Sequence, residues 1–334
     1  MKRIEWIDSL KGFGIFCVTF GHLACHYLIE THIYSFHMFL FFFISGFLHK
    51  KTQGSFKKHI ARKTKSLLIP FLLWNVISCF AGLFLGTTLS ETIRLFFLLD
   101  GVICWNAPIW FLIQLYIVEI VFFLVERHIP YGRYFSIPIL MALWVFVSGN
   151  NIFLKLNILP VSLLFYVFGN ISSDFLNKYS TKDRRKPKFV IPAALLLLCV
   201  NIVFGVYLNQ RISFTGANFG NVMYCCLGAV SGVLFYLIVF RNSRFLGTNK
   251  VLSYLGKNSL IIMAVQYWFF MLFDRISNRF FNLSVWYYRN TLKALVVAVV
   301  TILLICLMVE LLKKIGARSP VLKKICIWFG INVS

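Results

Sequence analysis

Charged residues are scarce in this sequence, and acidic residues are the scarcest of them. Only 13% of the 334 residues are Asp, Glu, Lys or Arg, with 11 acidic residues against 34 basic ones. A soluble domain carries about 25% charged residues. This composition excludes a soluble globular enzyme and a disordered chain. With 59% hydrophobic residues and 37 phenylalanines, the chain is predicted to be an all-α, polytopic membrane helical bundle.

Cysteines at the spacing of a metal site or redox motif are lacking as well. The nine cysteines include no C-x-x-C pair, and most of them lie inside apolar runs. Neither a disulfide framework nor a zinc site is indicated, and we expect small buried hydrophobic side chains. The apolar runs are continuous rather than alternating, which disfavours a β-barrel. The first run follows Asp8 and Lys11 and has no small-residue cleavage site after it, so we interpret it as a span rather than a signal peptide.

Ten apolar segments are long enough, or nearly so, to cross a bilayer as helices, for which about 20 residues are needed. They lie at 9–29, 33–49, 66–86, 108–126, 134–149, 152–170, 189–209, 219–240, 259–273 and 291–312. With the N-terminus inside, 27 of the 34 basic residues fall on the inner side. This bias predicts cytoplasmic N- and C-termini. Residues 1–312 then form the transmembrane domain, and 313–334 a basic tail at the inner membrane surface.

The basic excess fits inner loops that face anionic lipid or a polyanionic ligand, rather than nucleic acid. Several of the basic residues lie in one segment. Residues 56–70, FKKHIARKTKSLLIP, run from a loop into the third predicted span. Arg62 and Lys65 are spaced i, i+3 and share a helix face, and Lys58 lies one turn earlier. This face is suited to the phosphates of a nucleotide-like ligand. It is equally typical of an ordinary positive-inside anchor.

Ionisable residues inside spans are costly and are therefore functional candidates. The first span carries Asp8, Lys11 and His22, and the second carries His37. Lys11 and His22 are eleven residues apart, which is within about 20° of three full turns, so they share one helix face about 16 Å apart along the axis. We expect His22 about two turns below the outer end of its span and His37 about one turn deep in the next, at similar depth.

These residues can also be interpreted as having a structural rather than a catalytic role. Lys11 and Asp8 are also typical of a snorkelling interfacial pair, and His22 of a buried hydrogen-bonded residue. A metal site is not expected, because the histidines of the first two spans have no carboxylates near them on the same helices.

Three stretches together resemble the membrane acyltransferase 3 family. They are IDSLKGFGIFCVTFGH (residues 7–22), SFHMFLFFFISGFL (35–48) and ARKTKSLLIPF (61–71), with weaker agreement in APIWFLIQLYIVE (107–119) and LGKNSLII (255–262). The resemblance covers nearly the whole transmembrane chain. It implies a bacterial cytoplasmic-membrane O-acetyltransferase. Such an enzyme moves an acetyl group from cytoplasmic acetyl-CoA to a hydroxyl of an extracytoplasmic or lipid-linked glycan, such as a capsule, exopolysaccharide or cell-wall polymer.

The resemblance also implies catalytic residues. Lys11 and His22 match the family's pattern of a basic residue, ten residues and a histidine, which gives His22 the central role. Asp8 is expected to orient Lys11. His37 and Glu119 are added as further catalytic candidates, Glu119 because it lies deep in the fourth span.

For the donor, the family's Arg-x-x-Arg motif falls on Arg62 and Lys65, with Lys58 extending the CoA-binding face. Lysine in place of the second arginine loses bidentate phosphate binding. Gln266 stands about where the family often has a histidine, so it receives no catalytic role. Trp110 and Trp105 are candidates for stacking on a sugar, or for an interface belt.

Two alternatives stay open at this point. A transporter or flippase for a lipid-linked sugar has a similar number of spans and similar buried polar groups, but needs no acetyl-CoA. An acyltransferase for a small molecule keeps the chemistry and changes the acceptor.

Overall fold

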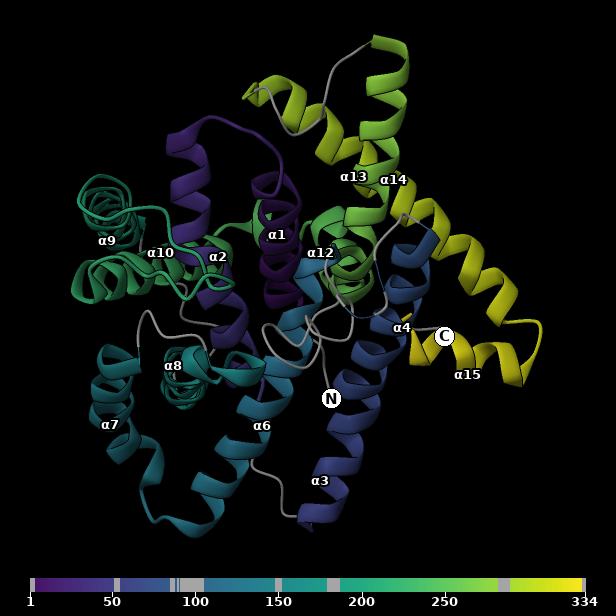
Figure 1. Ribbon diagram of the computed structural model, residues 1–334. Helices are drawn as coiled ribbons and strands as arrows, with labels where there is room; N and C mark the ends of the chain where they lie inside the picture. Colours follow the sequence, from purple (N-terminus) through teal and green to yellow (C-terminus); the bar gives the residue numbers. More distant parts are fainter. Residues whose placement is uncertain are drawn as a thin grey trace.

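The computed structural model describes residues 4–50, 55–84, 88, 90, 105–147, 152–178, 187–281 and 289–331. These residues are mostly helical, and Figure 1 shows the helices arranged around a centre occupied by α1 and α12. Within these ranges the β-structure consists of one isolated bridge between Ser213 and Asn218. The prediction of an all-α membrane bundle is confirmed.

The helices follow one another along the described chain with four irregular features. Two helices contain a π-helical stretch, which widens the turn, and short 3₁₀ turns precede α6 and α8. In order, the elements are α1 (Glu5–Gly21), α2 (Tyr27–Phe47), α3 (Phe56–Lys63), η1 (Thr64–Leu68), α4 (Ile69–Phe84), η3 (Ala107–Ile109), α6 (Trp110–His128), α7 (Gly132–Val147), η4 (Phe153–Ile158), α8 (Leu159–Lys178), α9 (Pro187–Val200), η5 (Asn201–Tyr207), α10 (Val222–Asn242), α11 (Arg244–Gly247), α12 (Lys250–Lys257), α13 (Ser259–Phe281), α14 (Thr291–Gly316) and α15 (Pro320–Trp328).

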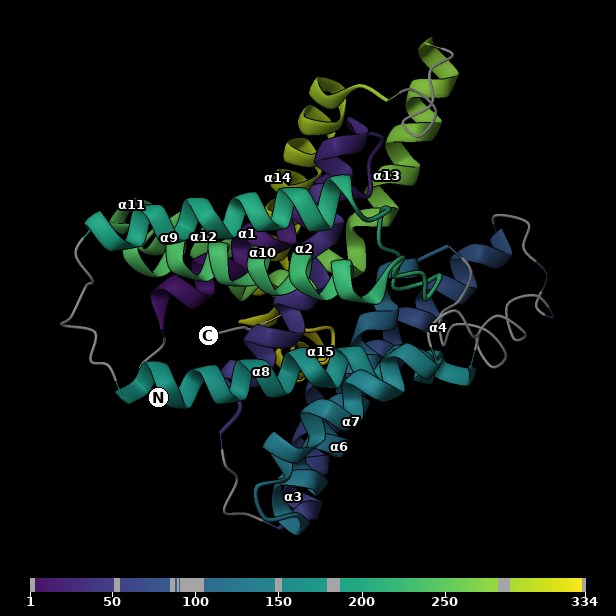
Figure 2. The same ribbon diagram turned by 90° about the vertical axis from the view of Figure 1, so that its left-hand side faces the viewer.

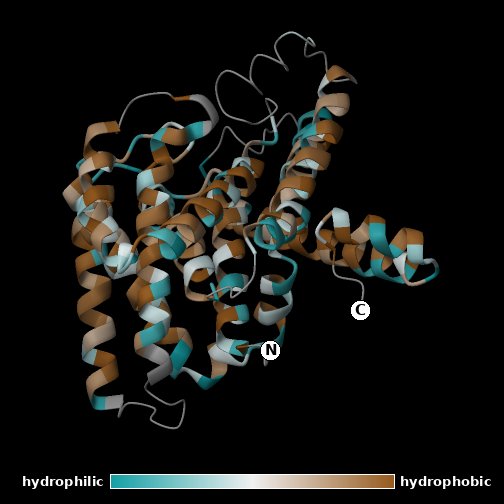
Figure 3. Cartoon of the chain, turned by 90° about the horizontal axis from the view of Figure 1, so that it is seen from below, coloured by the Kyte–Doolittle hydropathy of each residue, from teal (hydrophilic) through white to brown (hydrophobic). Residues whose placement is uncertain are grey.

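All ten predicted spans correspond to helices in the described part of the chain. Eight helical stretches there are long and apolar enough to cross a membrane. The other two, α1 with 17 residues and α7 with 16, are shorter. Figure 3 shows hydrophobic colouring along most of the length of the helices. Exposed side chains such as Phe189, Leu195 and Leu196 on α9 provide the apolar surface that a lipid environment requires.

The boundary between the first two helices differs from the prediction. α1 ends at Gly21 rather than at 29, and α2 begins at Tyr27 rather than at 33. The unbroken apolar run conceals the break, because residues 23–25 are apolar whether or not they are helical. The histidine after them starts the new helix: the backbone N–H of Leu28 donates to Nδ1 of His26, at 3.4 Å. His22 is therefore the C-cap of α1, and His37 lies ten residues into α2, about 15 Å along its axis.

A glycine on each helix allows α1 and α12 to cross in backbone contact. A Cβ atom on Gly12 would lie 1.8 Å from the carbonyl oxygen of Leu252, and one on Gly256 would lie 1.9 Å from that of Asp8. Small residues at a crossing are the usual means by which membrane helices approach closely. Gly256 belongs to the LGKNSLII stretch, so this weak sequence motif has a packing role.

Glycines on both helices likewise allow α2 and α8 to cross in backbone contact. A Cβ atom on Gly46 would lie 1.8 Å from the carbonyl oxygen of Tyr166, and one on Gly169 would lie 1.9 Å from that of Phe43. Figure 2 shows α8 lying lengthwise below the pair formed by α9 and α10. The two glycine crossings hold α1 and α2, the helices that carry the candidate histidines, between fixed neighbours.

The C-terminal stretch forms a separate short helix against the bundle. α14 continues to Gly316, and α15 then packs beside α14 and α4. The indole N–H of Trp74 donates to the carbonyl of Phe329 at 3.4 Å, and the two rings meet edge to face at 5.4 Å. The predicted basic tail is thus anchored by its apolar face, while Lys323 and Lys324 are exposed.

Candidate active site

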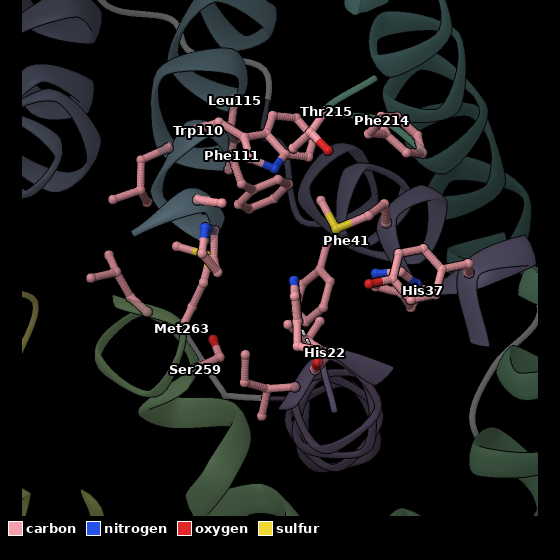
Figure 4. Close-up of a pocket in the computed structure, with 18 of the residues that line it drawn as sticks. His22, His37, Phe41, Trp110, Phe111, Leu115, Phe214, Thr215, Ser259 and Met263 are labelled. Carbon is pink, nitrogen blue, oxygen red and sulfur yellow. Dashed lines mark hydrogen bonds between the residues drawn. The ribbon is translucent and has the colours of Figure 1, made fainter. Parts of the chain in front are cut away.

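A cavity of about 350 Å³ lies between α1, α2, α6, the loop before α10 and the start of α13. Figure 4 shows side chains from all of these elements surrounding one open space. Three of the residues expected from the sequence line it: Lys11, His22 and His37. The structure therefore brings together candidates from two helices that the sequence could only place on separate spans.

His22 is held in one orientation by the helix that it ends. Its Nδ1 lies 2.6 Å from the carbonyl oxygen of Val18. A carbonyl only accepts, so Nδ1 carries the proton and Nε2 of the neutral ring is left with a lone pair. The ring is packed edge to face against Tyr34 and Tyr267, with centroids 6.3 and 5.3 Å away. A neutral imidazole fixed in this way, on the wall of a cavity, is equipped to accept a proton there.

His37 repeats this arrangement one helix away. Its Nδ1 donates to the carbonyl of Ile33 at 2.8 Å, and the side chain is buried. The ring of Tyr34 lies between the two imidazoles, with its centroid 4.9 Å from that of His37. Both rings therefore have the same tautomer, with Nε2 as the remaining acceptor.

Lys11 lines the cavity on the same helix as His22, but Asp8 does not line it. Asp8 is half-buried one turn earlier, where its backbone faces Gly256 of α12. The structure thus places Lys11 and His22 on the wall of one cavity, and puts Asp8 at the helix crossing one turn before Lys11.

Glu119 lies outside this cavity, in a buried ion network. It forms an ion pair with Lys63, and its Oε2 accepts a hydrogen bond from the hydroxyl of Tyr166 at 2.8 Å. Nδ1 of His49 lies 2.7 Å from that hydroxyl and 3.5 Å from the same carboxylate oxygen. Nε2 of His49 lies 3.4 Å from Glu126. The network joins α3, α6, α8 and the loop after α2.

His49, in the loop after α2, has a shifted pKa. Burial by itself lowers the pKa of this imidazole, but the hydrogen bonds and negative charges of Glu119 and Glu126 outweigh burial and raise it above its ordinary value. His49 is therefore protonated more readily than a free imidazole, which suits a partner in an ion network.

The predicted CoA-binding residues are all exposed on the segment before α4. Lys58 and Arg62 lie on α3, and Lys65 lies on η1. Because η1 is π-helical, the turn widens there and the i, i+3 spacing no longer aligns Arg62 with Lys65 as it would in an α-helix. Leu67 of η1 lines the cavity, so the basic segment leads directly to the site.

Gln266 is fully buried on α13, and neither atom of its amide has a hydrogen-bond partner in the described part of the chain. Its neighbour Tyr267 and the preceding turn, at Met263, line the cavity. Gln266 itself does not line it.

Of the two tryptophans, Trp110 lines the cavity and stacks on Phe214 with a 17° angle between the rings. Trp105 instead packs edge to face on Trp268 and donates to the carbonyl of Ser78.

Several cavity residues were missed by the sequence reasoning. Ser259, Tyr34, Tyr267 and Arg211 all line the site. Only Ser259 had a signal, since it lies inside the LGKNSLII stretch. Arg211 is in a loop predicted to lie outside the membrane, where a basic residue attracts no notice.

Comparison with known families gives one match. The family model of acyltransferase 3, described as an acyltransferase domain, matches residues 4–310. Neither curated proteins nor solved structures gave a match to this chain. Because the family match spans nearly the whole sequence and includes α1, α2 and η1 around the cavity, the chain belongs to the acyltransferase 3 family of membrane acyltransferases.

Proposed function

We propose that this protein is a membrane O-acetyltransferase of the bacterial cytoplasmic membrane. It transfers the acetyl group of cytoplasmic acetyl-CoA to a hydroxyl of an extracytoplasmic or lipid-linked glycan. The observation that carries the proposal is a cavity lined by both Lys11 and His22, in which the proton of His22 is fixed on Nδ1 and Nε2 remains an acceptor. The reaction class comes from the family; the donor and the acceptor are the proposal.

The donor is expected to enter from the basic segment. A cavity of about 350 Å³ lies at the lower end of the size range of small-molecule sites. It suits the acetyl group and the thiol-bearing arm of acetyl-CoA rather than the whole molecule. The nucleotide phosphates would stay outside, on the exposed Arg62, Lys65 and Lys58. Lys11, on the cavity wall, would meet the part of the donor that enters.

His22 supplies the base in this mechanism. Its Nε2 takes the proton of the acceptor hydroxyl as the oxygen attacks the thioester carbonyl. The tetrahedral intermediate then loses the CoA thiolate, the C–S bond breaks, and the imidazolium returns the proton to sulfur. The second imidazole, His37, holds a hydrogen-bonding Nε2 one ring away. A transient acyl group on His22 Nε2 would use the same geometry.

The experiment that tests this function measures binding and turnover of acetyl-CoA by the purified full chain in nanodiscs. We expect saturable binding, weakened by Arg62→Ala and kept by Lys57→Ala, a control on the same exposed segment. We expect slow thioester hydrolysis, lost in His22→Ala and kept in His26→Ala, whose histidine is exposed and does not line the cavity.

Two outcomes would count against the proposal. If the folded protein does not bind acetyl-CoA, a transporter of a lipid-linked sugar becomes the better explanation. If His22→Ala hydrolyses acetyl-CoA at the wild-type rate, the base has been assigned to the wrong residue.

A further inference from the structure

The charged side chains that line the cavity are all basic. Among the described residues they are Lys11 and Arg211, and no aspartate or glutamate lines the cavity. Lys11 is about 16 Å along α1 from His22, whereas Arg211 is at the His22 end. Its guanidinium lies 3.9 Å from the ring centroid of Tyr34, the ring that packs against His22. The donor side and the His22 side of the cavity therefore each have their own cation.

Arg211 forms an ion pair with Glu30, but this carboxylate is shared with a second arginine and leaves a net positive charge. Its Nε lies 2.6 Å from Oε1 of Glu30, which is only 8% exposed. The other oxygen of Glu30 lies 3.1 Å from Nη1 of Arg289. One buried carboxylate thus serves two arginines, and the group has a net charge of +1. Arg211 lines the cavity, while Arg289 does not.

The loop that carries Arg211 is built as a rigid wall. Ser213 and Asn218 exchange two backbone hydrogen bonds of 2.8 and 2.9 Å. Phe214 is buried against Trp110, and the ammonium of the buried Lys155 donates to the carbonyl of Thr215. The loop brings Ser213, Phe214 and Thr215 to the cavity next to Arg211. A wall that is ordered before binding loses little entropy when a ligand binds.

We propose that the acceptor is an acidic glycan, whose carboxylate or phosphate binds Arg211 while a hydroxyl of the same or the next sugar reaches His22. This rests on the proposed function and specifies its acceptor. A guanidinium stacked on an aromatic ring presents the geometry that matches carboxylate and phosphate. Because Arg211 and Arg289 share the one carboxylate of Glu30, the group keeps a net positive charge beside the cavity, which an anion of the ligand can balance. Trp110 and Phe214 add an aromatic surface for the apolar face of a sugar.

The test uses three acceptors that share the ring hydroxyls O2, O3 and O4 and differ at C6: a methyl β-glucoside, the corresponding β-glucuronide and the β-glucoside 6-phosphate. Only acetylation of those three shared hydroxyls is compared. The full chain in proteoliposomes is supplied with labelled acetyl-CoA, and label in each sugar is measured. We expect the wild type to acetylate an anionic sugar about 10- to 100-fold faster, at equal concentration, than the neutral one, the range for a charge-assisted hydrogen-bonded pair. The two anionic acceptors distinguish carboxylate from phosphate.

Variants assign the preference to Arg211. Arg211→Gln should bring the ratio of anionic to neutral rates close to one, through a higher KM for the anionic sugar. Arg211→Lys, which keeps the charge and the pairing with Glu30, should leave an intermediate ratio and guards against misfolding of the neutral variant. Arg279→Gln removes an exposed arginine of α13 that does not line the cavity, and should leave the ratio as in the wild type.

Four results overturn the inference. Equal rates on neutral and anionic sugars in the wild type would do so, and so would a preference that survives in Arg211→Gln. Acetylation of none of the three, while acetyl-CoA is still hydrolysed in a manner that depends on His22, would overturn the acidic acceptor and leave the acetyltransferase function standing. If the wild-type protein does not hydrolyse acetyl-CoA at all, both the acetyltransferase function and the acidic acceptor are overturned.

Discussion

The cavity between α1 and α2 and the ion network around Glu119 both contain histidine and lysine, but their side chains are satisfied in different ways. In the cavity, His22 and His37 each donate from Nδ1 to a backbone carbonyl one turn earlier, which leaves Nε2 as an acceptor. In the network, Lys63, His49 and Glu119 are bonded to one another. The first arrangement leaves hydrogen-bond acceptors on residues that line a cavity, whereas the second uses its polar groups to hold α3, α6, α8 and the loop after α2 together.

This comparison separates two roles that residue type alone does not. A buried charged network is strongly destabilised when one partner is removed, since the other is left buried without compensation. A fixed imidazole whose lone pair faces a cavity can be removed at much smaller cost to folding. Variants in the two regions should therefore fail in different assays.

The largest effect is expected at His22. His22→Gln, which keeps a side chain of similar size, should reduce acetyl transfer by about 10²- to 10⁴-fold, the range for loss of a general base. The melting temperature Tm in detergent should change little. Steady-state transfer of labelled acetyl groups and a thermal shift assay measure the two quantities. A large fall in Tm with a normal rate per folded molecule would mean that His22 belongs with the structural network.

The second prediction is the converse and concerns Glu119. Glu119→Leu should destabilise the protein by about 3–5 kcal/mol, because Lys63 loses its buried partner. The double variant Lys63→Met, Glu119→Leu should recover much of this loss. Chemical denaturation of the detergent-solubilised protein tests the cycle. If Glu119→Leu keeps wild-type stability and loses transfer, the carboxylate acts in catalysis, as the sequence suggested.

The third prediction is a pH dependence of stability that originates in the network. The pKa of His49 is raised in the fold, above the value of about 6.5 for the unfolded chain. The stabilisation is therefore fully present below about pH 6.5 and is lost as the pH rises through the folded value. The Tm difference between wild type and His49→Gln should be largest in mildly acidic buffer and should shrink toward alkaline pH. A difference that grows with pH would mean that His49 is neutral in the fold.

The helices and part of the candidate site could be predicted from the sequence. Long apolar runs predict helices regardless of tertiary context, which is why each of the ten predicted spans falls on a helix, eight of them long and apolar enough to cross a membrane. The break at residues 22–26 was missed because apolar residues in a loop cannot be told from those in a helix. The i, i+11 register predicted that Lys11 and His22 share a face, and both line the cavity.

Contacts between distant elements were beyond that reasoning. Glu119 was placed in the reaction cavity from its depth alone, whereas the partners that define its environment, Lys63 and Tyr166, come from α3 and α8. Lys63 itself attracted no attention beside Arg62 and Lys65. Its side chain turns into the bundle, and no local spacing rule reveals which of the three basic residues at positions 62, 63 and 65 does so.

The smallest effect distinguishes these neighbouring lysines. Lys65 is exposed at the position where the family motif has its second arginine, so Lys65→Arg should improve the KM for acetyl-CoA by a few-fold, about the value of one better hydrogen-bonded phosphate contact. Stability should not change. Lys63→Arg should instead lower Tm without improving KM, because a larger guanidinium must replace an ammonium packed against Glu119. The rate of acetyl-CoA hydrolysis measured against acetyl-CoA concentration gives the KM of each variant, and a thermal shift assay gives its Tm. If Lys63→Arg is the one that improves KM, the phosphates bind at the network end of α3, and the division between a chemical cavity and a structural network does not extend to the donor.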